Sequence, residues 1–176
     1  MMTETTPKTE KSPQEIIHAV IAWLETVNEN RGDRAELRRC RSPAEVAFVP
    51  AFYRLKMMVP QNFDPEKLAA VAGILSHVEI ERGEGPKVEI AELFARPADG
   101  GSAPRISEPR FRRLLRVADF DYAELYPIVT RLIRQIKRKV PESAMPSLIW
   151  GIYRWDQKTK RSWAEAYYEH IPRTED

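Results

Sequence analysis

The stretch from Pro127 to Lys139, PIVTRLIRQIKRK, constrains the fold and the surface of this chain more than any other. At about 100° per residue, its aliphatic side chains fall on one face of a helix; they are Ile128, Val129, Leu132, Ile133 and Ile136. Arg131, Arg134 and Arg138 fall on the opposite face, at spacing i, i+3 and i+7. The pattern predicts a helix with a buried apolar face and an outward row of positive charge.

No acidic residue between Ile128 and Lys139 neutralises this row. Two interpretations are open for the row taken alone. A basic helix face is most often simply solvated, whereas a rigid row of arginines is also suited to binding phosphate groups. The distribution of charge along the rest of the chain decides between them.

Charge is segregated along the chain, although the net charge of its 176 residues is only +2. Residues 105–139 contain ten Lys or Arg against four Asp or Glu, and residues 31–41 contain five Arg against two acids. Residues 79–99 are acidic, with six Asp or Glu against three Lys or Arg. Clustered basic segments are the electrostatic pattern of a nucleic-acid-binding protein, so the second interpretation is favoured.

Helical periodicity runs through most of the sequence, and alternation with period two is nearly absent. Ser12 to Glu15 form a capping box before a long amphipathic helix, and Ser42 to Glu45 repeat the signal. Pro50 lies within the apolar run 46–58 and should break or kink a helix there. We therefore predict an all-α fold, a compact multi-helix protein made of two packed helical sub-bundles.

The clearest linker is the Pro- and Gly-rich segment 97–104, PADGGSAP. It predicts an N-terminal helical half at 12–96 and a C-terminal helical half at 105–172. Residues 1–11 and 173–176 are predicted to be tails. A chain of this length can bury a core without disulfides or metals.

Signals for catalysis, metal binding or export are missing from the sequence. Cys40 is the only cysteine, and His18, His77 and His170 have no second histidine one helical turn away. Glycine-rich nucleotide-binding loops and an apolar run of membrane-spanning length are also missing. We expect a non-catalytic cytoplasmic protein without a cofactor, a metal or a membrane. Neighbouring arginines could lower the thiol pKa of Cys40, although an ordinary half-buried helical cysteine is the commoner case.

Several segments resemble one known family. They are Leu37-Arg38-Arg39, the string PAFYRL at 50–55, the string RISEPRFRRLLR at 105–116, the helix around Arg131 to Arg134, and Trp155, Trp163 and Tyr167-Tyr168. Together they resemble the CasB family, the small subunit of Cascade, the type I-E CRISPR surveillance complex. The resemblance covers most of residues 16–58 and 105–170, and PAFYRL is its most specific part.

The resemblance implies a helical, non-catalytic protein that lies as a head-to-tail pair of copies inside a ribonucleoprotein. There it would support the hybrid of guide RNA and target DNA, and the displaced DNA strand, through non-specific backbone contacts. Base pairing supplies sequence recognition in such complexes. The implied partners are the guide RNA, both strands of the target DNA, other Cascade subunits and a second copy of the chain.

The resemblance assigns the nucleic-acid contacts to arginines: Arg34, Arg38, Arg39, Arg54, Arg110, Arg112, Arg113, Arg116, Arg131, Arg134 and Arg138. Arg54 has a second possible role, because it could instead pair with a carboxylate and brace the two halves. Two other functions are open. The arginines of a protein–protein adaptor would meet an acidic partner, and a deaminase or nuclease is disfavoured because the sequence lacks metal ligands.

Overall fold

The computed structural model of the protein describes residues 10–173. The predicted tails, 1–11 and 173–176, fall mostly outside this range. Within it the fold is α-helical, which confirms the predicted fold class. The helices are α1 (Pro13–Glu29), α2 (Arg31–Arg39), α3 (Pro43–Val46), α4 (Pro50–Met58), α5 (Pro65–Leu75), α6 (Ile90–Ala95), α7 (Glu108–Leu115), α8 (Tyr122–Ile136), α9 (Met145–Tyr153) and α10 (Gln157–His170).

The predicted start signals act as expected. Glu15 N–H donates to Ser12 Oγ at 3.2 Å, and Ser12 N–H donates to Glu15 Oε2 at 2.6 Å, which completes the capping box of α1. The predicted break at Pro50 is also confirmed, because α3 ends at Val46 and Pro50 is the first residue of α4. Pro127, by contrast, lies inside a continuous α8.

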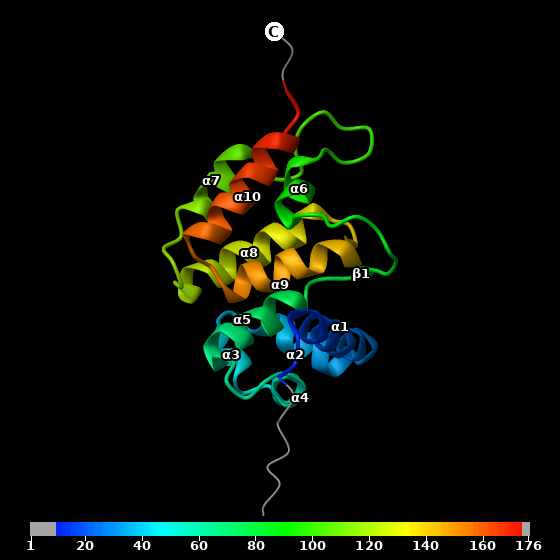
Figure 1. Ribbon diagram of the computed structural model, residues 1–176, viewed down its shortest axis with the longest axis vertical. Coiled ribbons are helices and arrows are strands. Elements are labelled where there is room, and N and C mark those ends of the chain that lie inside the picture. The colour runs from blue at the N-terminus through cyan, green and yellow to red at the C-terminus, as the bar shows by residue number, and fades with distance from the viewer. Residues whose placement is uncertain (1–9, 174–176) are drawn as a thin grey trace, which may run out of the picture.

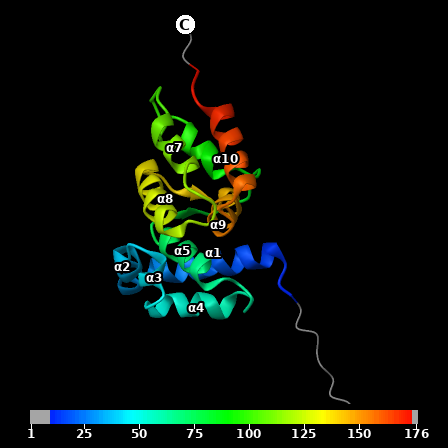
Figure 2. The same ribbon diagram turned by 90° about the vertical axis from the view of Figure 1, so that its left-hand side faces the viewer.

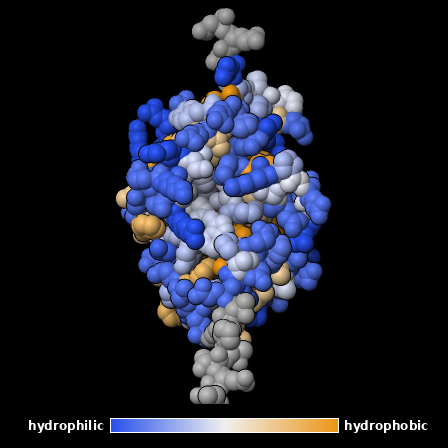
Figure 3. Space-filling view, in the orientation of Figure 1, coloured by the Kyte–Doolittle hydropathy of each residue, from blue (hydrophilic) through white to orange (hydrophobic). Residues whose placement is uncertain are grey.

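The helices form two groups stacked along the long axis of the molecule (Figure 1). Helices α1 to α5 make up one group, and α6 to α10 the other. The quarter-turn view separates the same groups and shows α2 beneath α8 on one side of the molecule (Figure 2). Hydrophilic residues cover most of the face seen in Figure 3, where apolar patches are small and scattered.

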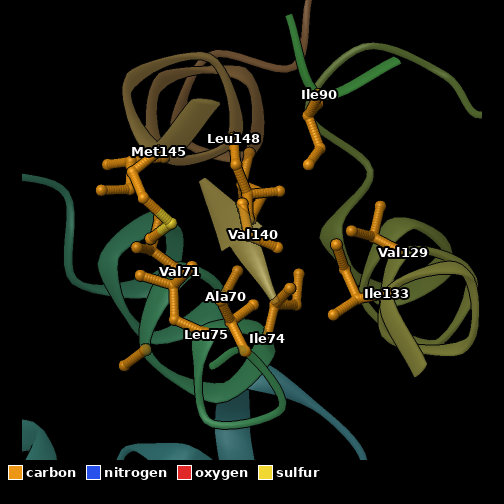
Figure 4. Close-up of a cluster of buried hydrophobic side chains, with 14 of the residues drawn as sticks. Ala70, Val71, Ile74, Leu75, Ile90, Val129, Ile133, Val140, Met145 and Leu148 are labelled. Carbon is orange, nitrogen blue, oxygen red and sulfur yellow. The ribbon is translucent and has the colours of Figure 1, made fainter. Parts of the chain in front are cut away.

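Helix α5 joins the two groups. Its residues Leu68–Leu75 are all buried, as expected for a helix that is apolar on every side. It packs against α3 and α4 in its own group and against α8 and α9 in the other. Figure 4 shows Ile74 among side chains from the second group, including Val129 and Ile133 of α8. One continuous core therefore holds α2 and α8 in fixed relative positions.

Helix α6 packs mainly against α10 and also contacts α8 and α9. It therefore belongs spatially with the second group, although it precedes the predicted linker. The segment 97–104 closes on itself through an isolated bridge between Pro97 and Pro104. The chain crosses between the groups earlier, in residues 76–89. The division into halves at 97–104 stays a prediction about domains.

Two short strands accompany the helices. Strand β1 (Ile80–Glu81) pairs in parallel with β2 (Val140–Pro141), with Ile80 opposite Val140. A two-residue strand is too short to show alternation, so the sequence pattern did not predict it. The pairing draws the chain after α8 toward the segment after α5. In residues 10–173 no helix combines the length and apolar character that crossing a membrane requires.

Candidate nucleic-acid interface

An open hollow of about 850 Å³ lies between α2, α7, α8 and the end of α5. Arginines supply half of its lining residues: Arg38, Arg39, Arg41, Arg110, Arg131 and Arg134. The others are Cys40, His77, Tyr126, Pro127, Thr130 and Gln135. Three basic segments far apart in the sequence therefore meet on one surface.

A second hollow, of about 470 Å³, adjoins the first. It is lined by Arg38, His77, Glu79, Ile133, Arg134, Lys137, Arg138 and Lys139. Three residues, Arg38, His77 and Arg134, line both hollows. We call the two hollows together the arginine groove, and these three residues its junction.

Helix α8 supplies one wall of the groove. Its inner face is buried and comprises Tyr122, Leu125, Tyr126, Ile128, Val129, Leu132, Ile133 and Ile136, whereas Arg131 and Arg134 are exposed one turn apart. The predicted row is wrong for Arg138. The helix ends at Ile136, because Lys137 has a left-handed backbone conformation with φ 48° and ψ 40°. Arg138 lies beyond this turn, with its Nη2 3.9 Å from Glu81 Oε2.

Helix α2 supplies the facing wall, and Arg38 is held there by the end of α5. Arg38 Nε donates to the carbonyl oxygen of Ser76 at 2.7 Å. Burial, and then the positive charges of Arg34 and Arg134, lower the pKa of Arg38. Arginine still keeps its charge at neutral pH. The guanidinium groups of α2 and α8 therefore repel one another across the groove, and a bound anion would relieve that repulsion.

The arginines of α7 do not form one row. Arg110 lines the arginine groove, whereas Arg112 and Arg116 line a separate hollow of about 260 Å³ with Glu108 and Pro109. Arg113 is exposed on the same helix. Of the remaining predicted residues, Arg39 lines the groove and Arg34 is half-buried on α2.

Arg54 forms an ion pair with Asp33. The sequence left open that Arg54 pairs with a carboxylate instead of nucleic acid, and the structure shows this pairing. Because Asp33 belongs to α2 and Arg54 to α4, the pair braces two helices of the same group. The suggestion that it braces the two halves is wrong. Asp33 is further fixed by the N-cap of α2, because its N–H donates to Asn30 Oδ1 at 3.1 Å.

We expect the replacement of Arg54 with alanine to affect stability slightly and nucleic-acid affinity not at all. The guanidinium is half exposed, and such ion pairs contribute about 0.2–1 kcal/mol to the free energy of unfolding. Urea denaturation and oligonucleotide titration of the variant measure both quantities. A tenfold loss of affinity with unchanged stability would contradict the structural role.

Several groove residues were missed by pattern reasoning. Arg41 and the pair Lys137 and Lys139 lie in the counted basic segments and were identifiable from composition alone. Tyr126 and Thr130 lie at the edge of the buried face of α8, and His77 follows α5, so their meeting has no sequence signal. Tyr126 is only 1% exposed, and its hydroxyl donates to the carbonyl oxygen of Cys40 at 3.4 Å.

Cys40 lines the groove, but it is not activated there. Burial, followed by the negative charges of Glu45 and Glu36, raises the pKa of its thiol. The nearby arginines therefore do not lower its pKa, and Cys40 is the ordinary half-buried cysteine that the sequence analysis gave as the commoner case. Among the residues that the structure describes, no group of three His, Cys, Asp or Glu is placed to hold a metal ion. The groove itself presents guanidinium and ammonium groups, which bind phosphate oxygens.

Comparison with known proteins identifies the family. The sequence profile described as CRISPR-associated protein Cse2 matches residues 33–168. None of the curated protein sequences matches the chain. A chain in the crystal structure of E. coli Cascade bound to a PAM-containing dsDNA target has a similar fold, with a TM-score of 0.64 and 22% identity over 89% of this chain and 94% of that one. The family match spans most of the protein, and the chain belongs to the Cse2 family of CRISPR-associated proteins.

Proposed function

We propose that this protein is a non-catalytic subunit of a CRISPR Cascade complex that binds nucleic-acid backbones in the arginine groove. The groove carries the proposal, because it gathers seven arginines and two lysines from separate segments. In this role the protein stabilises the hybrid of guide RNA and target DNA together with the displaced strand. The groove arginines are the main contacts, and Arg112, Arg113 and Arg116 form a secondary basic surface.

The chemistry of the groove favours backbone contacts over base recognition. A guanidinium fork matches the geometry of two phosphate oxygens, and every nucleotide offers the same oxygens. Helices α2 and α8 are fixed by the common core, so their arginines lie ready for an extended anionic strand. Binding should therefore be indifferent to sequence, with recognition left to base pairing.

The family and the exposed surface both support a role for this protein as one subunit of a larger complex. A fold-sharing chain belongs to the E. coli Cascade structure bound to a PAM-containing dsDNA target. Phe48, which follows α3, and Met57 of α4 are both 85% exposed, and we propose that these large apolar side chains contact a neighbouring subunit. We propose other Cascade subunits and a second, head-to-tail copy of the chain as partners, besides guide RNA and both strands of target DNA.

The isolated protein tests the groove directly. We expect weak, sequence-independent binding of single-stranded oligonucleotides, with log K falling by about 0.7 per phosphate contact for each unit of log salt. Because Cys40 is the only cysteine and lines the groove, a bound strand should also protect it from a maleimide reagent. Free protein at the same salt concentration is the control.

Two outcomes would contradict this function. One is an affinity that is the same at low and physiological salt. The other is salt-dependent binding that leaves Cys40 labelled at its free rate, which would place the strand elsewhere. Binding to an acidic protein but not to oligonucleotides would instead support the adaptor hypothesis.

A further inference from the structure

The junction of the arginine groove contains one side chain that phosphate-binding arginines alone do not explain. His77 is half-buried and lines both hollows. Its Nε2 atom is buried and has no hydrogen-bond partner in the described part of the chain. The hydroxyl oxygen of Thr130, on the facing helix α8, is also buried without a partner and lines the first hollow. Unpaired buried polar atoms are costly and call for an explanation.

The surroundings of His77 are cationic. Arg38 faces it from α2, Arg134 from α8 and Lys137 from the turn that follows α8. The other charged or titratable groups of the groove come from every element around it. They are Arg39 at the end of α2, Cys40 and Arg41 after α2, Arg110 of α7, Tyr126 and Arg131 of α8, Arg138 and Lys139 before β2, and Glu79 two residues after His77. Arg38 is anchored to the carbonyl oxygen of Ser76, the residue directly before His77. A guanidinium group and the imidazole are thereby held at the same point of the groove.

We propose that His77 is a phosphate-binding residue that hydrogen-bonds one backbone phosphate at the junction and takes up a proton when that phosphate enters. Arg38 and Arg134 supply the charge, and the imidazole supplies a donor that the empty groove leaves unpaired. His77 borders both hollows, so a strand that runs through the junction passes its ring. This inference rests on the proposed function. It adds a defined position for one phosphate and the uptake of one proton on binding.

The electrostatics of the empty site fit this role. Burial, and then the charges of Arg38 and Arg134, lower the pKa of His77 to about 4, so the imidazole is neutral in the free protein. A phosphate between the two guanidinium groups offsets their repulsion and stabilises the imidazolium. An opposite charge at this range raises a histidine pKa by about 1–3 pH units.

The sign of the pH dependence follows. If the pKa of His77 is higher in the complex than in free protein, the complex holds more protons between the two values. Affinity should then rise as pH falls through the bound-state pKa, and the gain should level off near pH 4, where free His77 also protonates. The expected gain is about tenfold for each pH unit by which the pKa rises.

The chain contains only three histidines, which makes the experiment direct. Imidazole signals of the full-length protein are followed by NMR from about pH 5 to 8, free and with oligo-dT of about 12 nucleotides. His77→Gln assigns the signal. His18 on α1 and His170 on α10 are internal references outside the groove. We expect the His77 signal to titrate in this pH range in the complex but not in the free protein. Oligo-dT should leave the signals of the other two histidines unchanged.

Affinity measurements complete the test. Wild-type protein should bind oligo-dT more tightly as pH falls from about 7 to about 5, and His77→Gln should lose most of that gain. If oligo-dT binds in a salt-dependent manner while His77 titrates at the same pH in free and bound protein, the role of His77 is overturned and the proposed function stands. If no salt-dependent binding occurs, both are overturned.

Discussion

Replacing Arg131 and Arg134 together with alanine should lower the affinity for single-stranded oligonucleotides by about 100-fold. Each lost charged hydrogen bond is worth about 1.5 kcal/mol, which corresponds to roughly tenfold in the dissociation constant. The slope of log K against log salt should fall in magnitude by about 1.4, because two phosphate contacts disappear. In an assembled complex the opened DNA strands should close faster, whereas guide binding should change little.

Stability should hardly change in this double variant. Both side chains point away from the buried face of α8, and alanine is the better helix former. Each substitution should alter the free energy of unfolding by no more than about 0.5 kcal/mol.

Lys158 and Arg161 of α10 provide the matched control. Both are exposed, and their replacement with alanine removes the same charge from a helix outside the groove. If this control loses as much affinity as the α8 variant, general charge rather than the groove determines binding. A folded, assembled α8 variant with unchanged strand opening would remove the role proposed for this helix.

Replacing Gly73 with alanine should destabilise the protein by about 1–3 kcal/mol. Gly73 lies in α5, where that helix passes α8, and an added Cβ would lie 2.6 Å from Cε2 and 2.7 Å from Cζ of Tyr126. Tyr126 is almost fully buried and cannot swing aside. Its ring also lines the groove, so its displacement should weaken oligonucleotide binding as well.

Replacing Gly32 with alanine, at an exposed site, should have the opposite effect on stability. An added Cβ there meets only Asn30 Oδ1, at an ordinary 3.4 Å, so alanine should stabilise α2 by about 0.5–1 kcal/mol. Thermal melting distinguishes the two, since 1 kcal/mol shifts the midpoint of a chain this long by about 2–4 °C. Equal midpoints for wild type and Gly73→Ala would show that α5 and α8 do not pack as closely as described.

Much of the local structure was determined by the sequence itself. Helical periodicity, the Ser12 capping box and the break at Pro50 depend on interactions within a few residues, and all are observed. The basic face of α8 as far as Arg134 was predictable for the same reason. Helical periodicity places these arginines opposite the buried face, so they are exposed. The family resemblance was likewise carried by local strings and is confirmed by the match over residues 33–168.

Tertiary structure alone decided which of these arginines act together. Arg38 and Arg134 are separated by nearly a hundred residues, and only the packing of α5 against both groups places them at one junction. The same packing brings His77 to that junction, and the contact between α2 and α4 pairs Arg54 with Asp33. The left-handed turn at Lys137 removes Arg138 from its helix. Periodicity reports how one segment divides between core and solvent, whereas charge across a groove depends on contacts between segments.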